Sequence, residues 1–433
     1  MMALDSKHRF YRENYNISNK ETRRACSGHP EAGRRGSAGG SKQRFVRNND
    51  LDRETGDGRR DRDVSVTRLD LTREQILSFR RRAGALDARL PFGEESLRRA
   101  AWAGLQDSVP RAALLSIHAR VNGAGPSAWE HPSLVQLWGP RFTVYVVAAR
   151  DHAVFSLGTL PDAAKGRTRA ADLAARLHAV LDGTRLDYAQ AGERLGLHNA
   201  NTLRYAAATG TVLLRWEGAR RPVVWTVQAP AVDLADARGE LARRYLRVFG
   251  PATAESFGAW SGTGPRGGAA AFALLGDSLL PVRTPIGDAW ILAADEADVR
   301  RGGSDGVSGG VPGTGSGGVA GGVAGGGSGS GSGGPVPVRL LPSGDPYLLL
   351  QGADRSLVVP DAGQRGELWT PRVWPGGLLI DGEVAGTWRR ADAVLTVRPW
   401  RRLSNVEREA VMAEAEALPL PGVEGRIVVR WGD

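Results

Sequence analysis

Residues 168–227 read TRAADLAARLHAVLDGTRLDYAQAGERLGLHNANTLRYAAATGTVLLRWEGARRPVVWTV. The first part places Leu173, Leu177 and Leu181 on one face of a helix that ends at Asp182-Gly183. The other expected elements, in order, are short helices over 186–195 and 199–209 and strands over 212–216 and 222–227. Three helices followed by a hairpin is the order of a winged helix.

A similar order of elements recurs on both sides of this stretch. Upstream, Thr72 and Gln75 form a capping box at the start of a helix, more helices follow, and 142–147 is a β-rich run. Downstream, an apolar helical face is followed by two short helices and a hairpin within 279–292. We therefore expect three tandem winged-helix units, over residues 64–160, 166–230 and 235–298.

The last part of the chain, 338–433, contains a series of short apolar runs. The strands expected there are 338–341, 347–350, 356–359, 378–380, 384–388 and 393–397. Asp381-Gly382 is a strong signal for a two-residue hairpin, and a helix over 405–417 precedes a last strand over 426–431. We expect an α+β protein in which three tandem winged-helix units are followed by a small antiparallel β-barrel-like domain.

Two segments have a composition that cannot form a core. Residues 302–337 are rich in Gly and Ser without periodicity, which predicts a flexible linker or a long surface insertion. Residues 1–63 have few apolar side chains, and we expect a disordered basic extension. This extension is either an arm that touches phosphates or the product of a start codon assigned too early, with Val64 or Val66 as the true beginning.

The charge of the chain favours a polyanionic partner. Lys and Arg together number 57 against 47 Asp and Glu, which gives a net charge of +10. Nearly all of the positive charge is Arg, the side chain that binds phosphates and guanine edges in a bidentate manner. A GC-rich genome, which encodes Arg in preference to Lys, is an alternative explanation for this excess.

The same composition argues against several other classes of protein. The lone cysteine, Cys26, excludes an intramolecular disulfide and any cysteine-based metal site, and the seven histidines lack the spacing of metal ligands. We expect no metal and no cofactor. The chain has no apolar stretch of membrane-spanning length and no secretory signal at its start, so we expect a cytoplasmic, nucleoid-associated protein without membrane contact.

Several motifs, in order, resemble a known family of bacterial winged-helix DNA-binding proteins that includes the AlkZ-like alkylpurine and crosslink DNA glycosylases. The motifs are 104–111 (GLQDSVPR), 141–145 (RFTVY), 242–246 (ARRYL) with 250–253 (GPAT), 340–347 (LLPSGDPY) and 381–389 (DGEVAGTWR). The resemblance covers residues 70–433 apart from the glycine-rich segment. It implies base-excision chemistry on double-stranded DNA.

The resemblance also implies a catalytic pair, from which this chain departs. Glycosylases of the family are implied to hold the attacking water with two side chains that flank one residue, as Gln-x-Gln or Gln-x-Asp. The matching residues here are Gln106 and Ser108. Gln106 keeps an amide that can donate to and accept from water, whereas Ser108 is shorter and offers only a hydroxyl. Asp107, between them, is expected to point away and to cap a helix.

Other polar residues are candidates for DNA contacts. These residues are Arg141, Asn199, Asn201, Arg204, Arg215, Arg220, Arg221, Arg243 and Arg244. The third helix of a winged helix enters the major groove, where Asn and Arg pair with base edges. The alternatives are a helix cap for each Asn and a solvated surface for each Arg.

The sequence thus predicts a DNA-binding protein, with glycosylase chemistry implied by the resemblance. The alternative is a transcription regulator or structural DNA binder without catalysis. A regulator usually dimerises on a palindrome, whereas a lesion enzyme works as a monomer without sequence preference, and we expect a monomer.

Overall fold

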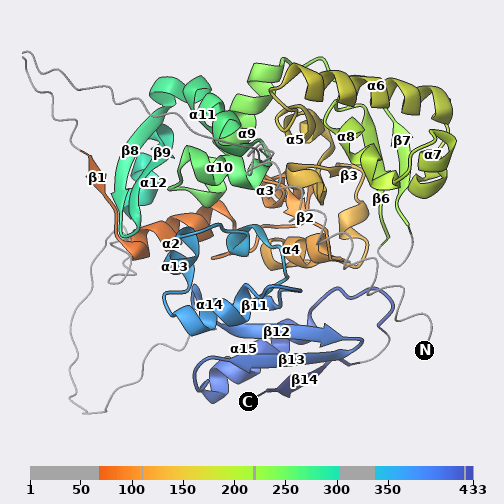
Figure 1. Cartoon of the computed structure of the whole chain (residues 1–433). Helices are drawn as coiled ribbons and strands as arrows, with labels where there is room; N and C mark the ends of the chain where they lie inside the picture. Colours follow the sequence, from red (N-terminus) through yellow and green to blue (C-terminus); the bar gives the residue numbers. More distant parts are fainter. Residues whose placement is uncertain (1–67, 110, 218–220, 302–336, 424–425, 433) are drawn as a thin grey trace, which may run out of the picture.

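The computed structural model describes residues 68–109, 111–217, 221–301, 337–423 and 426–432. The predictions for 1–63 and, apart from residue 337, for 302–337 therefore lie outside the described residues. The described chain is a mixed α+β protein with three sheets (Figure 1). The expected α+β class is confirmed.

The first part of the described chain carries helices around a short hairpin. Its elements are β1 (Leu69–Asp70), α2 (Arg73–Ala83), α3 (Glu94–Ala100), β2 (Leu105–Gln106), α4 (Ala112–Arg120), η1 (Ala128–Glu130), β3 (Leu134–Trp138), η2 (Pro140–Phe142), β4 (Val144–Ala148), η3 (Ala149–Asp151) and α5 (His152–Leu157). The predicted capping box of Thr72 and Gln75 begins α2. Strand β2 pairs with β4, so the residues after α3 form a sheet edge.

The central part contains the helices and hairpin predicted from residues 168–227. Its elements are α6 (Ala164–Leu181), β5 (Leu186–Asp187), α7 (Tyr188–Arg194), η4 (Ala200–Leu203), α8 (Arg204–Ala207), β6 (Val212–Arg215) and β7 (Val223–Thr226). Strand β6 also pairs with β3 of the preceding part, where Gln136 lies opposite Leu214. The two hairpins therefore share one six-stranded sheet, in the order β2-β4-β3-β6-β7-β5.

The third part again places helices before a hairpin. Its elements are α9 (Leu234–Phe249), α10 (Ala254–Ser261), α11 (Gly264–Leu275), η5 (Gly276–Ser278), β8 (Leu279–Thr284), β9 (Gly287–Leu292), η6 (Ala293–Asp295) and α12 (Glu296–Arg301). Strand β1, from the other end of the sequence, pairs in parallel with β8 and completes a three-stranded sheet. Helix α2 packs beside α9 and α12, so residues 69–83 join this part.

The C-terminal part forms an open five-stranded sheet, and the predicted barrel is wrong. Its elements are β10 (Val338–Leu341), η7 (Pro346–Leu348), α13 (Asp354–Val358), α14 (Ala362–Leu368), β11 (Gly376–Ile380), β12 (Glu383–Ala391), β13 (Val394–Pro399), α15 (Asn405–Glu416) and β14 (Val428–Trp431). The sheet order is β10-β11-β12-β13-β14, without pairing between the outer strands. The last pair is parallel because α15 carries the chain across before β14.

Two predicted strands of this part are helical. The run 347–350 contributes to η7, because Asp345 caps the turn and Pro346 begins it. The run 356–359 lies largely in α13, which packs on α2. Short apolar runs do not distinguish a buried strand from a buried helix by periodicity alone.

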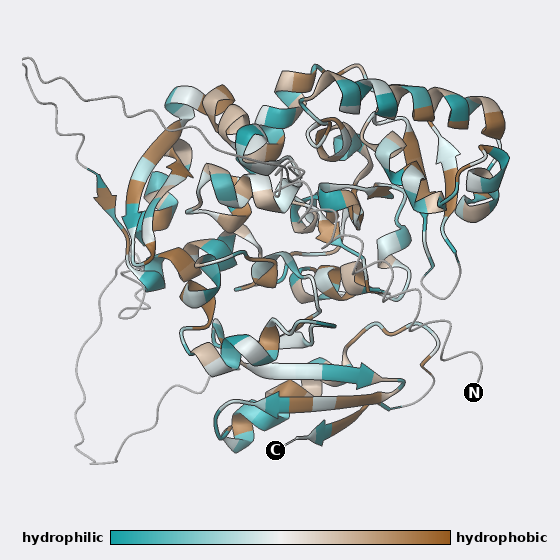
Figure 2. Ribbon diagram, in the orientation of Figure 1, coloured by the Kyte–Doolittle hydropathy of each residue, from teal (hydrophilic) through white to brown (hydrophobic). Residues whose placement is uncertain are grey.

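A continuous apolar core joins the parts. Its largest cluster includes Leu77 of α2, Tyr145 of β4, Trp260 of α10 and Tyr347 of η7. Figure 2 shows hydrophilic residues spread over the outward faces of the helices, such as α6 and α15. Within the described residues, no helix is long and apolar enough to cross a membrane. The parts of the chain are therefore held together by shared packing, which fixes the loops where they meet.

Candidate active site at the junction of three loops

Gln106 and Ser108 lie on the same side of the backbone, next to Arg141. Gln106 Nε2 donates a hydrogen bond to Ser108 Oγ (2.9 Å). The guanidinium of Arg141 donates to Gln106 Oε1 (3.2 Å). All three side chains are half-buried. The amide of Gln106 is thus oriented from both ends, with its oxygen toward a cation and its nitrogen toward a hydroxyl.

The β3–β4 turn places Arg141 at this site. Residues Arg141 and Phe142 both have φ 55°, in the left-handed region that non-glycine residues avoid. Gly262, at the end of α10, lets this helix approach the β3–β4 turn closely, because a Cβ on residue 262 would lie 3.1 Å from the Arg141 backbone nitrogen. Such backbone conformations cost about 1–3 kcal/mol each and persist only where the surrounding structure imposes them. The turn therefore holds Arg141 in a fixed place.

A loop of the C-terminal part covers Gln106 from another side. Gly344 has φ +83°, and a Cβ at this position would lie 3.6 Å from Gln106 Cδ. The adjacent Asp345 is fully buried and receives two hydrogen bonds from Arg120 (2.7 and 2.8 Å), one from Ser116 Oγ (2.7 Å) and one from the Tyr347 backbone (2.9 Å). This ion pair anchors the loop on α4, directly beside the candidate site.

Asp107 points away from Gln106 and Ser108, as the alternation along an extended backbone predicts. Its Oδ1 accepts from the Ala113 backbone (3.1 Å) in the first turn of α4, and its Oδ2 accepts from Gln136 Nε2 (2.8 Å). Gln136 Oε1 in turn accepts from the Trp216 backbone (2.7 Å). Asp107 thus accepts from an N–H of the first turn of α4, but the N-cap residue of this helix is Arg111, so the prediction that Asp107 is the N-cap is wrong. The network links the candidate site to the end of β6.

Burial raises the pKa of Asp107 to about 7, against the lowering effect of the Ala113 N–H and the charge of Arg111. The folded protein therefore holds the Asp107 proton more tightly than the unfolded chain, whose carboxyl titrates near pH 4. We expect the free energy of unfolding to decrease as the pH rises from about 4 to about 7, by at most about 1.4 kcal/mol per pH unit from this group. Asp107→Asn should lack this component, because its amide does not titrate.

Urea unfolding of the wild type and Asp107→Asn at several pH values between 4 and 7.5 measures the difference. The free energy of unfolding of the wild type should fall relative to that of Asp107→Asn as the pH rises, so the two curves separate toward high pH. Parallel curves would show that Asp107 has an ordinary pKa in the folded state.

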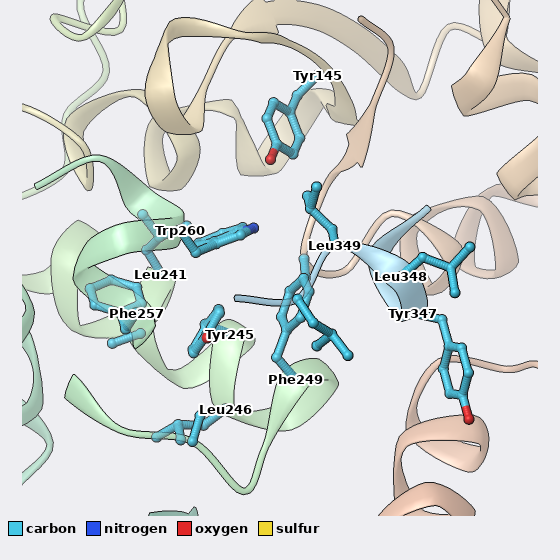
Figure 3. Close-up of a cluster of buried hydrophobic side chains, with 14 of the residues drawn as sticks. Tyr145, Leu241, Tyr245, Leu246, Phe249, Phe257, Trp260, Tyr347, Leu348 and Leu349 are labelled. Carbon is cyan, nitrogen blue, oxygen red and sulfur yellow. The ribbon is translucent and has the colours of Figure 1, made fainter. Parts of the chain in front are cut away.

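A wall of aromatic side chains adjoins Arg141. The hydroxyl of Tyr145 and the indole nitrogen of Trp260 point toward one another (Figure 3). Both polar atoms are buried, and the hydrogen-bonding neighbours of the Tyr145 hydroxyl are Thr143, Arg141 and Trp260. Burial raises the pKa of Tyr145, which keeps its hydroxyl protonated and available as a donor. The Tyr145 hydroxyl therefore links the aromatic wall to the side chain of Arg141.

On the helix expected to read DNA, Arg204 and the neighbouring Tyr205 contact the turn that carries Arg141. Asn199 caps η4, where its Oδ1 accepts from the Asn201 backbone (2.9 Å), and Asn201 is half-buried. Arg204 donates to the Phe142 carbonyl (3.5 Å) in the turn that carries Arg141. Tyr205 packs edge-on against the Phe142 ring at 4.9 Å. This helix therefore holds the β3–β4 turn in place.

The other expected DNA contacts have mixed surroundings. Arg215 pairs with Glu130 (2.9 Å) and stacks 4.0 Å from the Trp129 ring, and Arg221 is exposed. Arg220 lies outside the described residues. Arg243 is exposed and pairs with Glu240 (2.7 Å). The structure thus brings Gln106, Ser108 and Arg141 together, with Arg204 nearby, while Arg215, Arg221 and Arg243 lie elsewhere.

Arg244 is buried and belongs to an ion-pair network. It contacts Asp151 (3.0 Å) and Glu240 (2.8 Å), and Arg98 also binds Asp151 (2.9 Å). Burial alone would raise the pKa of Asp151, but hydrogen bonds from Arg244 and Arg98 hold it at about 2. With 2% of its surface exposed, Arg244 has little area to offer to DNA.

Two contributions to the site were not predicted from the sequence. The loop at Gly344, which covers Gln106, carries a Gly-Asp-Pro run, and such a run is a usable signal for a tight turn near functional residues. The Gln136–Asp107 pair had no local signal. Among the residues that the structure describes, no group of three or more His, Cys, Asp or Glu side chains could hold a metal ion.

Comparison with known proteins identifies the family. The model of the AlkZ-like DNA glycosylases matches residues 99–419, so the chain belongs to the AlkZ-like family, and the resemblance seen in the sequence is confirmed. This family makes it a DNA repair glycosylase-like protein with DNA as its partner.

The fold is similar to that of a solved structure. It is the Streptomyces sahachiroi DNA glycosylase AlkZ, with a TM-score of 0.62, 18% sequence identity, and a match that covers 84% of this chain and 100% of that chain. At this identity the similarity shows the fold. No curated protein sequence matches the chain.

Proposed function

We propose that this protein is a monomeric DNA glycosylase that releases alkylated bases from double-stranded DNA. The observation that carries the proposal is the hydrogen bond between Gln106, at the end of β2, and Ser108, beside Arg141, at positions that match the family's two catalytic side chains. Family membership supports glycosylase chemistry, while the choice of alkylated bases follows from the resemblance.

The geometry suits the positioning of a water molecule. Gln106 Oε1 accepts one hydrogen bond from Arg141, and an amide oxygen has a second lone pair that can accept from water. Ser108 Oγ accepts from Gln106 Nε2, so its own proton remains available as a donor. Such a water would attack the sugar carbon while the base leaves with the bonding electrons and one water proton passes to solvent. A cationic alkylated purine leaves as a neutral base and needs no acid.

The arrangement of the chain supports binding to duplex DNA. The central and third parts each have helices followed by a hairpin, as a winged helix does, and the net charge is +10. Exposed Arg221 and Arg243 are suited to phosphate contacts, which are independent of base sequence. In this proposal the protein acts on the nucleoid in the cytoplasm, without a metal or cofactor.

A second candidate function is DNA binding without catalysis. Two observations favour it. The Gln106 amide already forms one hydrogen bond with Arg141 and one with Ser108. The Ser108 side chain is also too short to hold a water molecule as a second Gln or Asp would. This alternative predicts binding without release of a base.

Lengthening the second side chain tests the glycosylase proposal. Ser108→Asp and Ser108→Gln should raise the rate of base release several-fold, because each restores a second polar group for the water. The measurement is single-turnover release of 7-methylguanine from a duplex, with Ser404→Asp as the control, since Ser404 caps the distant α15. Unchanged rates in both Ser108 variants would contradict the assigned role of Ser108.

A further inference from the structure

The two faces of the C-terminal sheet have different surroundings. Helix α15 packs on one face, where Trp388 shares an apolar cluster with Val411 of the helix. On the other face, Leu341 belongs to the large cluster that joins the parts of the chain. A Cβ at Gly377 on this second face would lie 2.8 Å from Leu348 of η7. The second face is therefore the side of the sheet that packs on the rest of the protein.

This second face continues beyond the strands that are covered. Residues opposite one another in adjacent strands share a face, and so do residues two positions apart in one strand. Leu341 lies opposite Gly377, which lies opposite Thr387. Thr387 in turn lies opposite Arg398. Arg398 is therefore on the face that packs on the rest of the protein, but it is three strands away from β10, and its side chain is exposed.

Two more arginines join Arg398 on the exposed part of this face. Thr396, two positions before Arg398, lies opposite Arg389 in β12 and opposite Arg430 in β14. The side chains of Arg389 and Arg430 are exposed. Because neighbouring strands are about 4.8 Å apart, the backbones of these two residues are about 10 Å apart, with Thr396 between them. We call Arg389, Arg398 and Arg430 the arginine face.

The charge of the arginine face is not balanced by any carboxylate in the part of the chain that the structure describes. By contrast, the exposed Arg426 of the same sheet region binds Glu416 at 2.7 Å. The guanidinium of Arg389 donates to the Val373 carbonyl (2.9 Å), which has no net charge. Like charges on neighbouring strands repel one another, and a bound polyanion removes this repulsion. The arginine face therefore has the character of a binding surface for a polyanion.

The arginine face is aligned with the loop that covers Gln106. Strand β10 ends at Leu341, and the loop that follows carries Gly344 to Gln106. Arg398 lies in the same row across the sheet as Leu341, at three strand spacings or about 14 Å, and Arg430 is one strand, or about 5 Å, farther. Duplex DNA rises about 3.4 Å per base pair, so these separations correspond to about 4–6 base pairs.

We propose that the arginine face binds backbone phosphates of the duplex that flanks the damaged nucleotide, on one side of it. The DNA partner follows from the family, and the inference rests on the proposed function for the place of the damaged nucleotide at Gln106. Each guanidinium presents a planar fork of N–H groups that matches two oxygens of a phosphate. Phosphate contacts position a protein on a duplex and carry no sequence information. The arginine face thus adds affinity and orientation without base preference.

The salt dependence of binding to an undamaged duplex of two helical turns, followed by fluorescence anisotropy, tests the contact. A triple variant with Arg389→Gln, Arg398→Gln and Arg430→Gln should reduce the slope of log affinity against log salt concentration by about 2–3, because each lost phosphate contact reduces it by about 0.9. An unchanged slope in this variant would overturn the proposal.

A second triple variant controls for net charge. It combines Arg283→Gln, Arg300→Gln and Arg426→Gln, three exposed arginines that pair with Asp288, Glu296 and Glu416. The change in net charge is the same as in the first variant, but the slope should stay close to that of the wild type. Equal reductions in the two triple variants would contradict a localised phosphate contact.

Two neighbouring positions of β12 test the assignment to one face. Arg390 is exposed like Arg389, but it lies opposite Leu395 on the α15 side of the sheet and donates to the Asp392 carbonyl (2.9 Å). Arg389→Gln should reduce the salt slope by about 0.9, whereas Arg390→Gln should leave it unchanged. Equal effects of the two substitutions would overturn the assignment.

Base release separates this proposal from the proposed function. The binding measurements use undamaged DNA, so they do not depend on catalysis. A reduced slope in the arginine-face variant, together with no base release by the wild type, would retain the arginine face and reject the glycosylase. Base release by the wild type, together with an unchanged slope in the variant, would retain the glycosylase and reject the arginine face.

Discussion

Gln106→Ala is expected to reduce the release of alkylated base from duplex DNA by about 100-fold or more, in the range found when one positioned catalytic group is removed. The affinity for the duplex should change less than about 2-fold, because the amide acts on the attacking water in the transition state. Gln106 is half-buried, and its Oε1 and Nε2 already contact Arg141 and Ser108, so alanine removes the centre of the site.

Single-turnover kinetics and fluorescence anisotropy on the same duplex measure the two effects. Gln190→Ala is the matched control, since Gln190 is exposed on α7 far along the chain from the site. If Gln106→Ala released base at the wild-type rate, the attacking water would have to be held elsewhere. A parallel loss of affinity and rate would instead assign Gln106 to DNA binding.

Asp345→Ala is expected to lower the free energy of unfolding by about 3–5 kcal/mol, the cost of breaking a buried ion pair and leaving its partner uncompensated. Asp345 has no exposed surface and Arg120 has 2%, so the arginine left behind has little access to water. The substitution also removes the acceptor of the Ser116 hydroxyl and the Tyr347 N–H. The loop that covers Gln106 should then lose its anchor on α4.

Urea denaturation of Asp345→Ala and Asp288→Ala measures this effect against a control. Asp288 also pairs with arginines, Arg68 and Arg283, but 54% of its side chain is exposed, and exposed pairs contribute about 0–1 kcal/mol. Similar losses in the two variants would contradict the view that the Arg120–Asp345 pair fastens the covering loop.

Local signals in the sequence predicted local structure well. The Thr72 and Gln75 pair marked the start of α2, and Asp381-Gly382 forms the tight turn between β11 and β12, where both residues have positive φ. The family motifs predicted Gln106 and Ser108 as a pair, and the two side chains hydrogen-bond although Ser108 lies just beyond the end of β2. In each case, residues within four positions of one another determine the outcome.

Long-range structure was not predictable in the same way. Arg120 and Asp345 are 225 positions apart, and nothing in the residues around either one indicates the other. The pairing of β3 with β6, which joins two hairpins into one sheet, likewise depends on packing between distant segments. The expected DNA contact Arg244 is buried in an ion-pair network. Its partners are Glu240, on the same helix α9, and Asp151, which is 93 positions away in the sequence.

The most direct test of the central claim is to measure free base. The purified wild-type protein is incubated with a duplex that carries 7-methylguanine or 3-methyladenine. Chromatography of the supernatant should show the methylated base appearing above the spontaneous rate, in a sample where anisotropy confirms that the duplex is bound. The release should require Gln106. A bound duplex without any base above the spontaneous rate would contradict the glycosylase assignment and leave a DNA-binding protein of the AlkZ-like fold.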